Sequence, residues 1–127
     1  MDQNIDENRK AAIAFYRTAY EGNPRLAVEQ YIGDTYIKHN PLVGDGKEAF
    51  IAYFERVIND YPEKSIEFVR SVAEGDLVAL HTHQTWPGGD EYVTMDFFRF
   101  DEVGKIIEHW DSIQQIPEES ENGNPMY

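Results

Sequence analysis

The sequence predicts an α+β domain in which N-terminal helices pack on one face of a curved antiparallel sheet. Two observations predict this class. The first half of the chain repeats apolar residues at spacings of three and four, which is typical of amphipathic helices. The second half contains four runs rich in Val, Ile, Phe, Thr and Trp, which are typical of strands. With 127 residues, the chain is long enough for one domain with its own core.

Three helices are predicted in the first half. The first lies within residues 5–23, and its regularly spaced apolar positions are Ala12, Phe15, Tyr16, Ala19 and Tyr20. Asn23 and Pro24 form a cap and first-turn pair that opens a short second helix. Residues 34–46 contain a proline and two glycines and predict a loop, after which the helical spacing returns over residues 47–59.

Strands are predicted over residues 65–73, 76–86, 92–100 and 105–115. They are separated by "EG", "PGGD" and "DEVG", which are hairpin-turn signals, so the strands should form an antiparallel meander. The predicted domain therefore covers residues 1–116. The remaining residues, 117–127, are dominated by Pro, Glu, Asn and Gly and predict a polar tail on the surface.

The turn lengths predict which residues lie opposite one another in the sheet. Four-residue loops at "PGGD" and "DEVG" place side chains from three strands on the same face, because the side-chain period of a strand is two. Two polar rows result: His81, Asp96 and His109 form one, and His83, Thr94 and Asp111 form the other. With "EG" as a two-residue turn, Phe68 lies beside His81 and provides an apolar wall. Glu108 then points to the opposite face.

Side chains from the first half complete the predicted site. His39 and Asn40, in the loop before the third helix, are expected to close the polar rows from above. Aromatic residues of the helices are expected to cover an apolar cavity: Tyr16, Tyr20, Phe50, Tyr53 and Phe54. The residues predicted to bind the ligand are His39, Asn40, His83, Thr94, Phe68, Tyr16 and Phe54.

The opposite face of the predicted sheet carries Trp86, Met95, Phe97 and Trp110, with Gln84, Arg99 and Glu108 among them. Such an apolar surface favours burial against another copy of the chain or against a helix. We therefore expect a homodimer that forms through this face.

Composition excludes several classes of function. The chain has 24 acidic and 11 basic residues and a formal net charge of −13, which argues against nucleic acid or anionic membrane as a partner. No cysteine is present, which excludes disulfides and thiolate metal sites. The polar first ten residues do not resemble a signal peptide, and no stretch reaches the ~20 apolar residues of a membrane span. A cytoplasmic location is expected.

Three segments carry a family resemblance: "YIKHNP", "HTHQTWPGG" and, above all, "DFFRFDEVGKIIEHWD". On these segments the chain resembles the SnoaL-like branch of the NTF2-like superfamily, which includes polyketide cyclase relatives, from the first helix to about residue 115. The resemblance implies a cone-shaped α+β barrel in which helices and a curved sheet enclose a pocket, and which often dimerises.

The resemblance also implies roles for individual residues. In polyketide cyclases of this family, an aspartate in the last strand, two residues after a histidine, is the acid/base of an intramolecular aldol condensation. The matching positions here are Asp111 and His109. Asp96 falls where the family has a histidine in the preceding strand. The resemblance implies no metal and no other cofactor.

The predicted chemistry is acid/base catalysis on a small hydrophobic carbonyl compound. Burial and mutual repulsion raise the pKa of carboxylates in such a site, which suits removal of a proton alpha to a carbonyl. Asp111 is the expected base, with His109 orienting it or stabilising an enolate oxygen. Asp96 and His81 are expected to fix the histidine tautomers. Cyclisation, isomerisation and hydrolysis all remain open as the reaction.

Two alternatives remain at this point. A metal-dependent enzyme would use His81, His83, Asp96 and His109 as ligands, a set that suits Zn²⁺ or Fe²⁺. A binding protein without catalysis would use the same cavity for a small hydrophobic molecule. Whether the chain is an enzyme at all is therefore open on the sequence alone.

Overall fold

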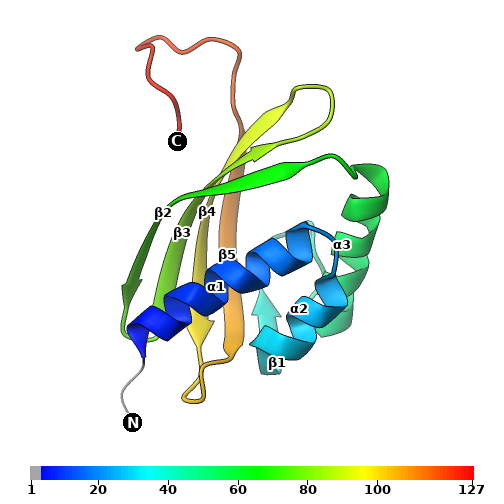
Figure 1. Cartoon of the computed structure of the whole chain (residues 1–127), viewed down its shortest axis with the longest axis vertical. Coiled ribbons are helices and arrows are strands. Elements are labelled where there is room, and N and C mark those ends of the chain that lie inside the picture. Colours follow the sequence, from blue (N-terminus) through cyan, green and yellow to red (C-terminus); the bar gives the residue numbers. More distant parts are fainter. Residues whose placement is uncertain (1–3) are drawn as a thin grey trace.

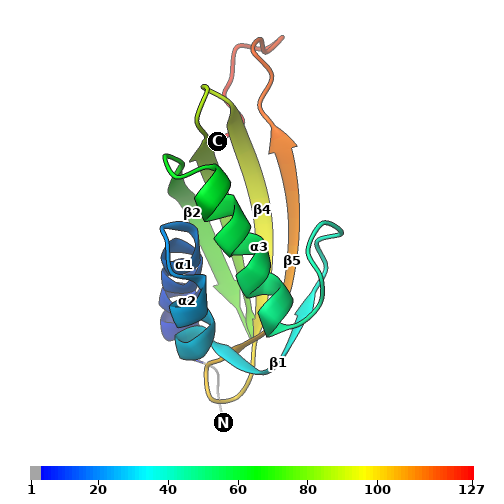
Figure 2. The same cartoon turned by 90° about the vertical axis from the view of Figure 1, so that its right-hand side faces the viewer.

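A computed structural model describes residues 4–127, so the first three residues of the predicted domain lie outside the described part. The structure is α+β, with helices packed on one face of a mixed sheet (Figures 1 and 2). In chain order the elements are α1 (Ile5–Tyr20), α2 (Pro24–Tyr31), β1 (Ile32–Lys38), α3 (Lys47–Asp60), β2 (Ser65–Glu74), β3 (Leu77–Thr85), β4 (Glu91–Phe100) and β5 (Ile106–Gln115).

The three predicted helices are present, and side chains cap the first two. The side chain of Asn4 accepts a hydrogen bond from the backbone N–H of Glu7 at 3.1 Å, at the start of α1. Asn23 does the same for Leu26 at 3.1 Å, and Pro24 occupies the first turn of α2. These side chains satisfy backbone donors that have no partner within the helix. The cap and first-turn pair predicted at Asn23 and Pro24 is confirmed.

The sheet has the order β1-β5-β4-β3-β2 and remains open, so the predicted barrel is not closed. The four predicted strands form the antiparallel meander β2 to β5. The additional strand, β1, overlaps the start of the region predicted as a loop and pairs in parallel with β5. Its sequence is polar and contains a glycine, so it was not recognised as a strand. Its side chains nevertheless alternate as those of a strand do, because Tyr36 is buried while Ile37 beside it is exposed. β1 carries Lys38 to the last strand of the chain.

The predicted register is wrong at each hairpin. Between β3 and β4, Leu80 rather than His81 lies opposite Asp96, because the loop of residues 87–89 is one residue shorter than predicted. Both Gly88 and Gly89 adopt positive φ there, which allows the tighter turn. A shift of one residue moves every side chain of a strand to the other face.

The β4–β5 register differs from the prediction by two residues. Asp96 lies opposite Asp111, and His109 lies opposite Phe98. One residue of the difference arises because Asp101 pairs with Lys105, which shortens the loop to residues 102–104, and the other arises from a bulge between Arg99 and Phe100. A shift of two residues preserves the faces, so the relative orientation of Asp96, His109 and Asp111 is as predicted. In the β2–β3 hairpin, Phe68 lies opposite Thr82 instead of His81.

Aromatic rings fill the space between the helices and the inner face of the sheet. Phe15 of α1 is 2% exposed and lies against Phe50, with ring centroids 5.2 Å apart, and edge-on to Tyr36 and Phe98. Such ring pairs add stabilisation beyond the burial of their area. This aromatic core joins α1 to Phe98 of β4 and α3 to Tyr36 of β1.

The outer face of the sheet carries both apolar and polar groups. Met95 and Phe97 are about half exposed, whereas Gln84 and Trp86, which were predicted here, lie on the inner side. The polar tail folds back on this face, because the ring of Tyr127 stacks on His83 with centroids 3.7 Å apart and the carbonyl of Met126 lies 3.0 Å from His81 Nε2. Over residues 4–127, none of the helices has the length and apolar character needed to cross a membrane.

Candidate functional site

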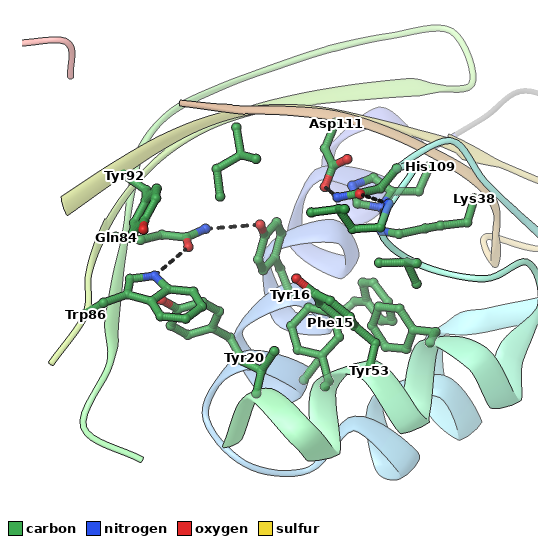
Figure 3. Close-up of a pocket in the computed structure, with 18 residues that line it drawn as sticks. Phe15, Tyr16, Tyr20, Lys38, Tyr53, Gln84, Trp86, Tyr92, His109 and Asp111 are labelled. Carbon is green, nitrogen blue, oxygen red and sulfur yellow. Dashed lines mark hydrogen bonds between the residues drawn. The ribbon is translucent and has the colours of Figure 1, made fainter. Parts of the chain in front are cut away.

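A cavity of about 240 Å³ lies between the helices and the inner face of the sheet (Figure 3). Most of its wall is apolar or aromatic. The lining residues are Phe15, Tyr16, Ala19, Tyr20, Lys38, Asn40, Leu42, Val43, Phe50, Tyr53, Phe54, Val57, Gln84, Trp86, Tyr92, His109, Asp111 and Ile113. All five helix aromatics predicted to cover a cavity are among them. The volume is below the roughly 300–1,000 Å³ of sites for drug-sized ligands, which favours a smaller molecule.

Charged groups gather at one end of this cavity, where β1 and β5 lie side by side. Figure 3 shows Asp111, His109 and Lys38 together there. Asp111 is the only carboxylate and Lys38 the only ammonium among the described residues that line the cavity. The amide of Asn40 donates to Asp111 Oδ2 at 3.2 Å, while Asp111 Oδ1 is buried without a hydrogen-bond partner. A buried acceptor without a partner is costly, so this oxygen is poised to receive a proton from a ligand.

His109 connects the cavity to a carboxylate behind it. His109 Nε2 lies 2.9 Å from Oδ1 of Asp96, which is fully buried, and His109 Nδ1 contacts the amino group of Lys38. The ring of His109 stacks on Phe98 with centroids 4.3 Å apart. Asp96, His109 and Lys38 thus form a continuous hydrogen-bonded row from the sheet to the cavity.

The partners of His109 determine its tautomer. Burial, followed by the nearby Lys38 cation, holds the pKa of His109 well below its usual range, so the imidazole is neutral. A neutral imidazole has one N–H, and the Asp96 carboxylate is the acceptor for it at Nε2. Nδ1 therefore accepts a hydrogen bond from Lys38. That Asp96 fixes the tautomer of His109 stays a prediction, for which the bond between them supplies the contact.

Burial brings the pKa values of Asp96 and Lys38, the two ends of this hydrogen-bonded row, close to each other. It raises the pKa of Asp96 to about 7, an effect that the hydrogen bond from Thr94 and the Lys38 charge oppose. Burial also lowers the pKa of Lys38 to about 8, against the attraction of Asp111 and Asp96. Both groups therefore titrate near neutral pH, which is where proton-transfer groups are most effective.

A second strip of polar side chains runs from Asp96 along the inner face of the sheet. Thr94 donates to Asp96 Oδ2 at 2.6 Å and lies 2.5 Å from the hydroxyl of Thr82. Gln84 donates to Thr82 at 3.3 Å and to the hydroxyl of Tyr16 at 3.2 Å. Such a buried network is stable because its members satisfy one another. It joins the charged end of the cavity to the end at Gln84.

Three residues predicted for the site lie on the opposite side of the sheet. His81 and His83 face outward as a result of the one-residue shift between β3 and β4. His39 also lies outside: its ring stacks on Trp110 with centroids 4.8 Å apart, and Nε2 lies 2.8 Å from Glu108. Glu108 points away from the cavity, as predicted. These histidines therefore do not contact the cavity.

The remaining predicted residues lie on the inner side. Asn40, Tyr16 and Phe54 line the cavity beside Asp111 and His109. Thr94 contacts Asp96 behind the wall of the cavity. Phe68 packs edge-on against Tyr16, with centroids 5.8 Å apart, and supports the wall from outside.

The metal-ligand set predicted from the sequence is not formed. His81 and His83 lie on the opposite face of the sheet from Asp96 and His109. Both ring nitrogens of His109 already have partners, Asp96 and Lys38. A metal would need a free lone pair on His109, and the contact with the Lys38 amino group uses it.

Sequence reasoning missed several residues of the site. Lys38 was not recognised because β1 was predicted as a loop, and Tyr36, which lies 3.4 Å from His109 Nδ1, was missed for the same reason. Gln84 and Trp86 were placed on the wrong face by the register error. The signal that could have identified Lys38 is the alternation in "TYIKHN", which puts Lys38 on the same side as buried Tyr36.

The lowered pKa of Lys38 predicts a specific pH dependence of stability. Between pH 8 and 10.5 the folded protein holds fewer protons at Lys38 than the unfolded chain, so the contribution of Lys38 to stability rises with pH in that window. Wild type should therefore gain about 2 kcal/mol relative to Lys38→Met between pH 8 and 10. Urea unfolding of both proteins at these two pH values checks this. Parallel changes in the two proteins would contradict it.

Comparisons with known proteins agree with this fold. The sequence profile of the SnoaL-like domain matches residues 12–109. No curated protein sequence matches the chain. Among solved structures, TsrD from Streptomyces laurentii superposes with a TM-score of 0.75 at 20% identity, over 89% of this chain and 92% of that one.

Two further structures are similar at 17% identity, each with a TM-score of 0.72. One is a candidate isomerase of the SnoaL-like family from Agrobacterium tumefaciens str. C58, with 84% of this chain and 97% of that one covered. The other is a LEH-like epoxide hydrolase of M. tuberculosis, with 88% and 86% covered. At such identities the likeness shows the fold alone.

Proposed function

Because the chain belongs to the SnoaL-like domain family, we propose that it is a cofactor-free acid/base enzyme acting on a small hydrophobic carbonyl compound. The observation that carries the proposal is the placement of Asp111, with its unpartnered buried oxygen, at the one charged end that the described residues form in a mostly apolar and aromatic cavity. Cyclisation, isomerisation and hydrolysis are the candidate reactions. Structures with this fold include a candidate isomerase and an epoxide hydrolase.

The proposed first step is removal of a proton alpha to the carbonyl by Asp111 Oδ1. Asn40 orients the carboxylate through its bond to Oδ2. The carbonyl oxygen faces the charged end, where Lys38 can stabilise the developing negative charge. The aromatic wall holds the apolar part of the substrate and excludes water, which strengthens these electrostatic interactions.

Exchange of alpha protons with solvent deuterium tests the proposal without knowledge of the natural substrate. Phenylacetaldehyde and 2-indanone fit the proposed class, because each has acidic alpha protons next to an apolar ring. The proposal predicts exchange above the buffer rate, followed by NMR in D₂O. Exchange at the buffer rate for both compounds, despite binding, would favour a passive binding protein for small hydrophobic molecules. The largely aromatic wall of the cavity supports that alternative.

A homodimer that forms through the outer face of the sheet and a cytoplasmic location are also proposals. The half-exposed side chains of Met95 and Phe97 support the dimer, because an exposed apolar patch is stabilised by burial. Trp110 on the same face is stacked against His39 and belongs to the same patch. Sedimentation of the protein in solution tests the dimer, and a monomer at high concentration would contradict it.

A further inference from the structure

The amino group of Lys38 lies at the charged end of the cavity in contact with a histidine that is itself bonded to a carboxylate. We propose that Lys38 is a covalent nucleophile that forms an imine with the carbonyl carbon of the substrate, and that His109 and Asp96 relay its proton. This inference rests on the proposed function, since it requires a carbonyl substrate in the cavity. It assigns Lys38 a role beyond that of a fixed positive charge.

The geometry supplies a route for the proton that an ammonium must lose before it can act as a nucleophile. Lys38 donates to His109 Nδ1, and His109 Nε2 donates to Asp96 Oδ1 at 2.9 Å. A proton can move from Lys38 to Nδ1 while the Nε2 proton moves to Asp96, which leaves a neutral amine and a neutral carboxyl. An amine next to a suitably oriented base is the arrangement expected of an activated nucleophile.

The surroundings make this transfer easy. The pKa of Asp96, raised to about 7 by burial, and that of Lys38, lowered to about 8 by burial, differ by about one unit. Transfer of a proton from Lys38 to Asp96 is therefore far less unfavourable than transfer between a lysine and an aspartate with ordinary pKa values. Burial disfavours both charges, so the same apolar wall raises one pKa and lowers the other.

The substrate can reach the amine. Lys38 and Asp111 line the same cavity, and Nζ of Lys38 lies 5.6 Å from the centre of the Phe50 ring. Figure 3 shows Lys38 and Asp111 at the same end of the cavity, so a carbonyl carbon bound at Lys38 would have its alpha carbon near Asp111. The aromatic covering limits entry of water, which would hydrolyse an imine.

The reaction balances without a cofactor. After the relay, the lone pair of the Lys38 amine forms a bond to the carbonyl carbon, and the C=O π electrons move to the oxygen, which takes a proton from the nitrogen. The resulting hydroxyl receives the proton stored on Asp96 through His109. The C–O bond then breaks, water leaves and a positively charged iminium remains. Asp111 removes the alpha proton, and the C–H electrons flow to the iminium nitrogen to give an enamine.

Lys64 and Lys105, two other lysines with described contacts, differ from Lys38. Lys64 lies over the ring of Tyr20 at 4.7 Å, and burial lowers its pKa, but it does not line the cavity. Lys105 donates to the backbone carbonyl of Gln30 at 2.6 Å. Lys64 is therefore the matched comparison within the chain, because it is a partly buried lysine without a histidine and carboxylate relay.

Reductive trapping tests the proposal directly. The protein is incubated with phenylacetaldehyde or 2-indanone and sodium cyanoborohydride near pH 7, and the labelled peptide is identified by mass spectrometry. We expect a single reduced adduct on Lys38. At pH 7, an amine of pKa about 8 has about 300-fold more neutral form than one of pKa 10.5, so Lys38 should react far ahead of exposed lysines.

Two variants and one parallel measurement define the outcomes. Lys38→Arg keeps the positive charge and should form no adduct, whereas Lys64→Arg should be labelled at Lys38 like wild type. Alpha-proton exchange is measured on parallel samples without the reductant, because a reduced Lys38 can no longer form the iminium. Exchange without an adduct on Lys38 would overturn the imine while leaving the proposed function in place. An adduct without exchange would support the nucleophile and contradict Asp111 as the base. Label spread evenly over Lys64 and Lys38 would overturn the special role of Lys38.

Discussion

Replacing Asp111 with Asn should reduce turnover of the carbonyl substrate by about 10²–10⁴-fold while leaving the fold intact. The amide has nearly the same shape as the carboxylate, and its oxygen can still accept the hydrogen bond that Asn40 now donates to Oδ2. What is lost is the ability of Oδ1 to take a proton. The rate of alpha-proton exchange and kcat should therefore fall together, whereas binding of the apolar part of the substrate should change little.

The control for this variant is Asp34→Asn, which makes the same chemical change at an exposed position of β1. It should have wild-type turnover and a wild-type circular dichroism spectrum. Turnover within a few-fold of wild type in Asp111→Asn would show that another group removes the proton. Loss of the folded spectrum would show instead that the carboxylate is needed for structure.

Truncation of Phe98 to Ala should lower the free energy of unfolding by about 3–5 kcal/mol. Phe98 is fully buried, lies edge-on to Phe15 and Tyr16, and stacks on the ring of His109 at 4.3 Å. Its removal leaves a cavity that the surrounding rings cannot fill, because packed aromatic side chains have little freedom to collapse. A loss of this size is a large share of the roughly 5–15 kcal/mol that stabilises a typical domain.

The matched control is Phe97→Ala, the same truncation at the preceding residue of β4. Phe97 points to the outer face and is 48% exposed, so its truncation should cost less than about 1 kcal/mol. Both variants are compared by urea unfolding at low protein concentration, where a dimer would dissociate. Equal losses in the two variants would contradict the assignment of Phe98 to the core and Phe97 to the surface.

The effect of each strand-register error on the predicted site depended on whether the strand was shifted by an odd or an even number of residues. The β4–β5 register was wrong by two residues, yet Asp96, His109 and Asp111 were correctly placed on one face, because a shift of two restores the side-chain direction. The β3–β4 register was wrong by one, and this moved His81 and His83 to the outer face. A three-residue loop and a four-residue loop read almost alike in "PGGD", so the sequence alone did not decide between them.

The helices and the meander were predictable because they depend on local spacing and turn signals. β1 was not, because a parallel strand has no hairpin to mark its partner and its residues include Gly33 and Asp34. The missing strand also explains why Lys38 was overlooked. The position of the cavity could be predicted from the helix aromatics, while the ammonium at its end required the structure.

The parallel pairing of β1 with β5 also affects how the protein folds. The contacts of Lys38 with His109 and of Asn40 with Asp111 each join residues 71 positions apart in the chain. On a ribosome, the first partner of each pair must therefore wait until β5 has been synthesised. Until then β4 would be a bare sheet edge with inward-facing Asp96, a charged group that discourages pairing with other chains. Contacts of such high sequence separation are slow to form, so the charged end of the cavity should be among the last parts to assemble.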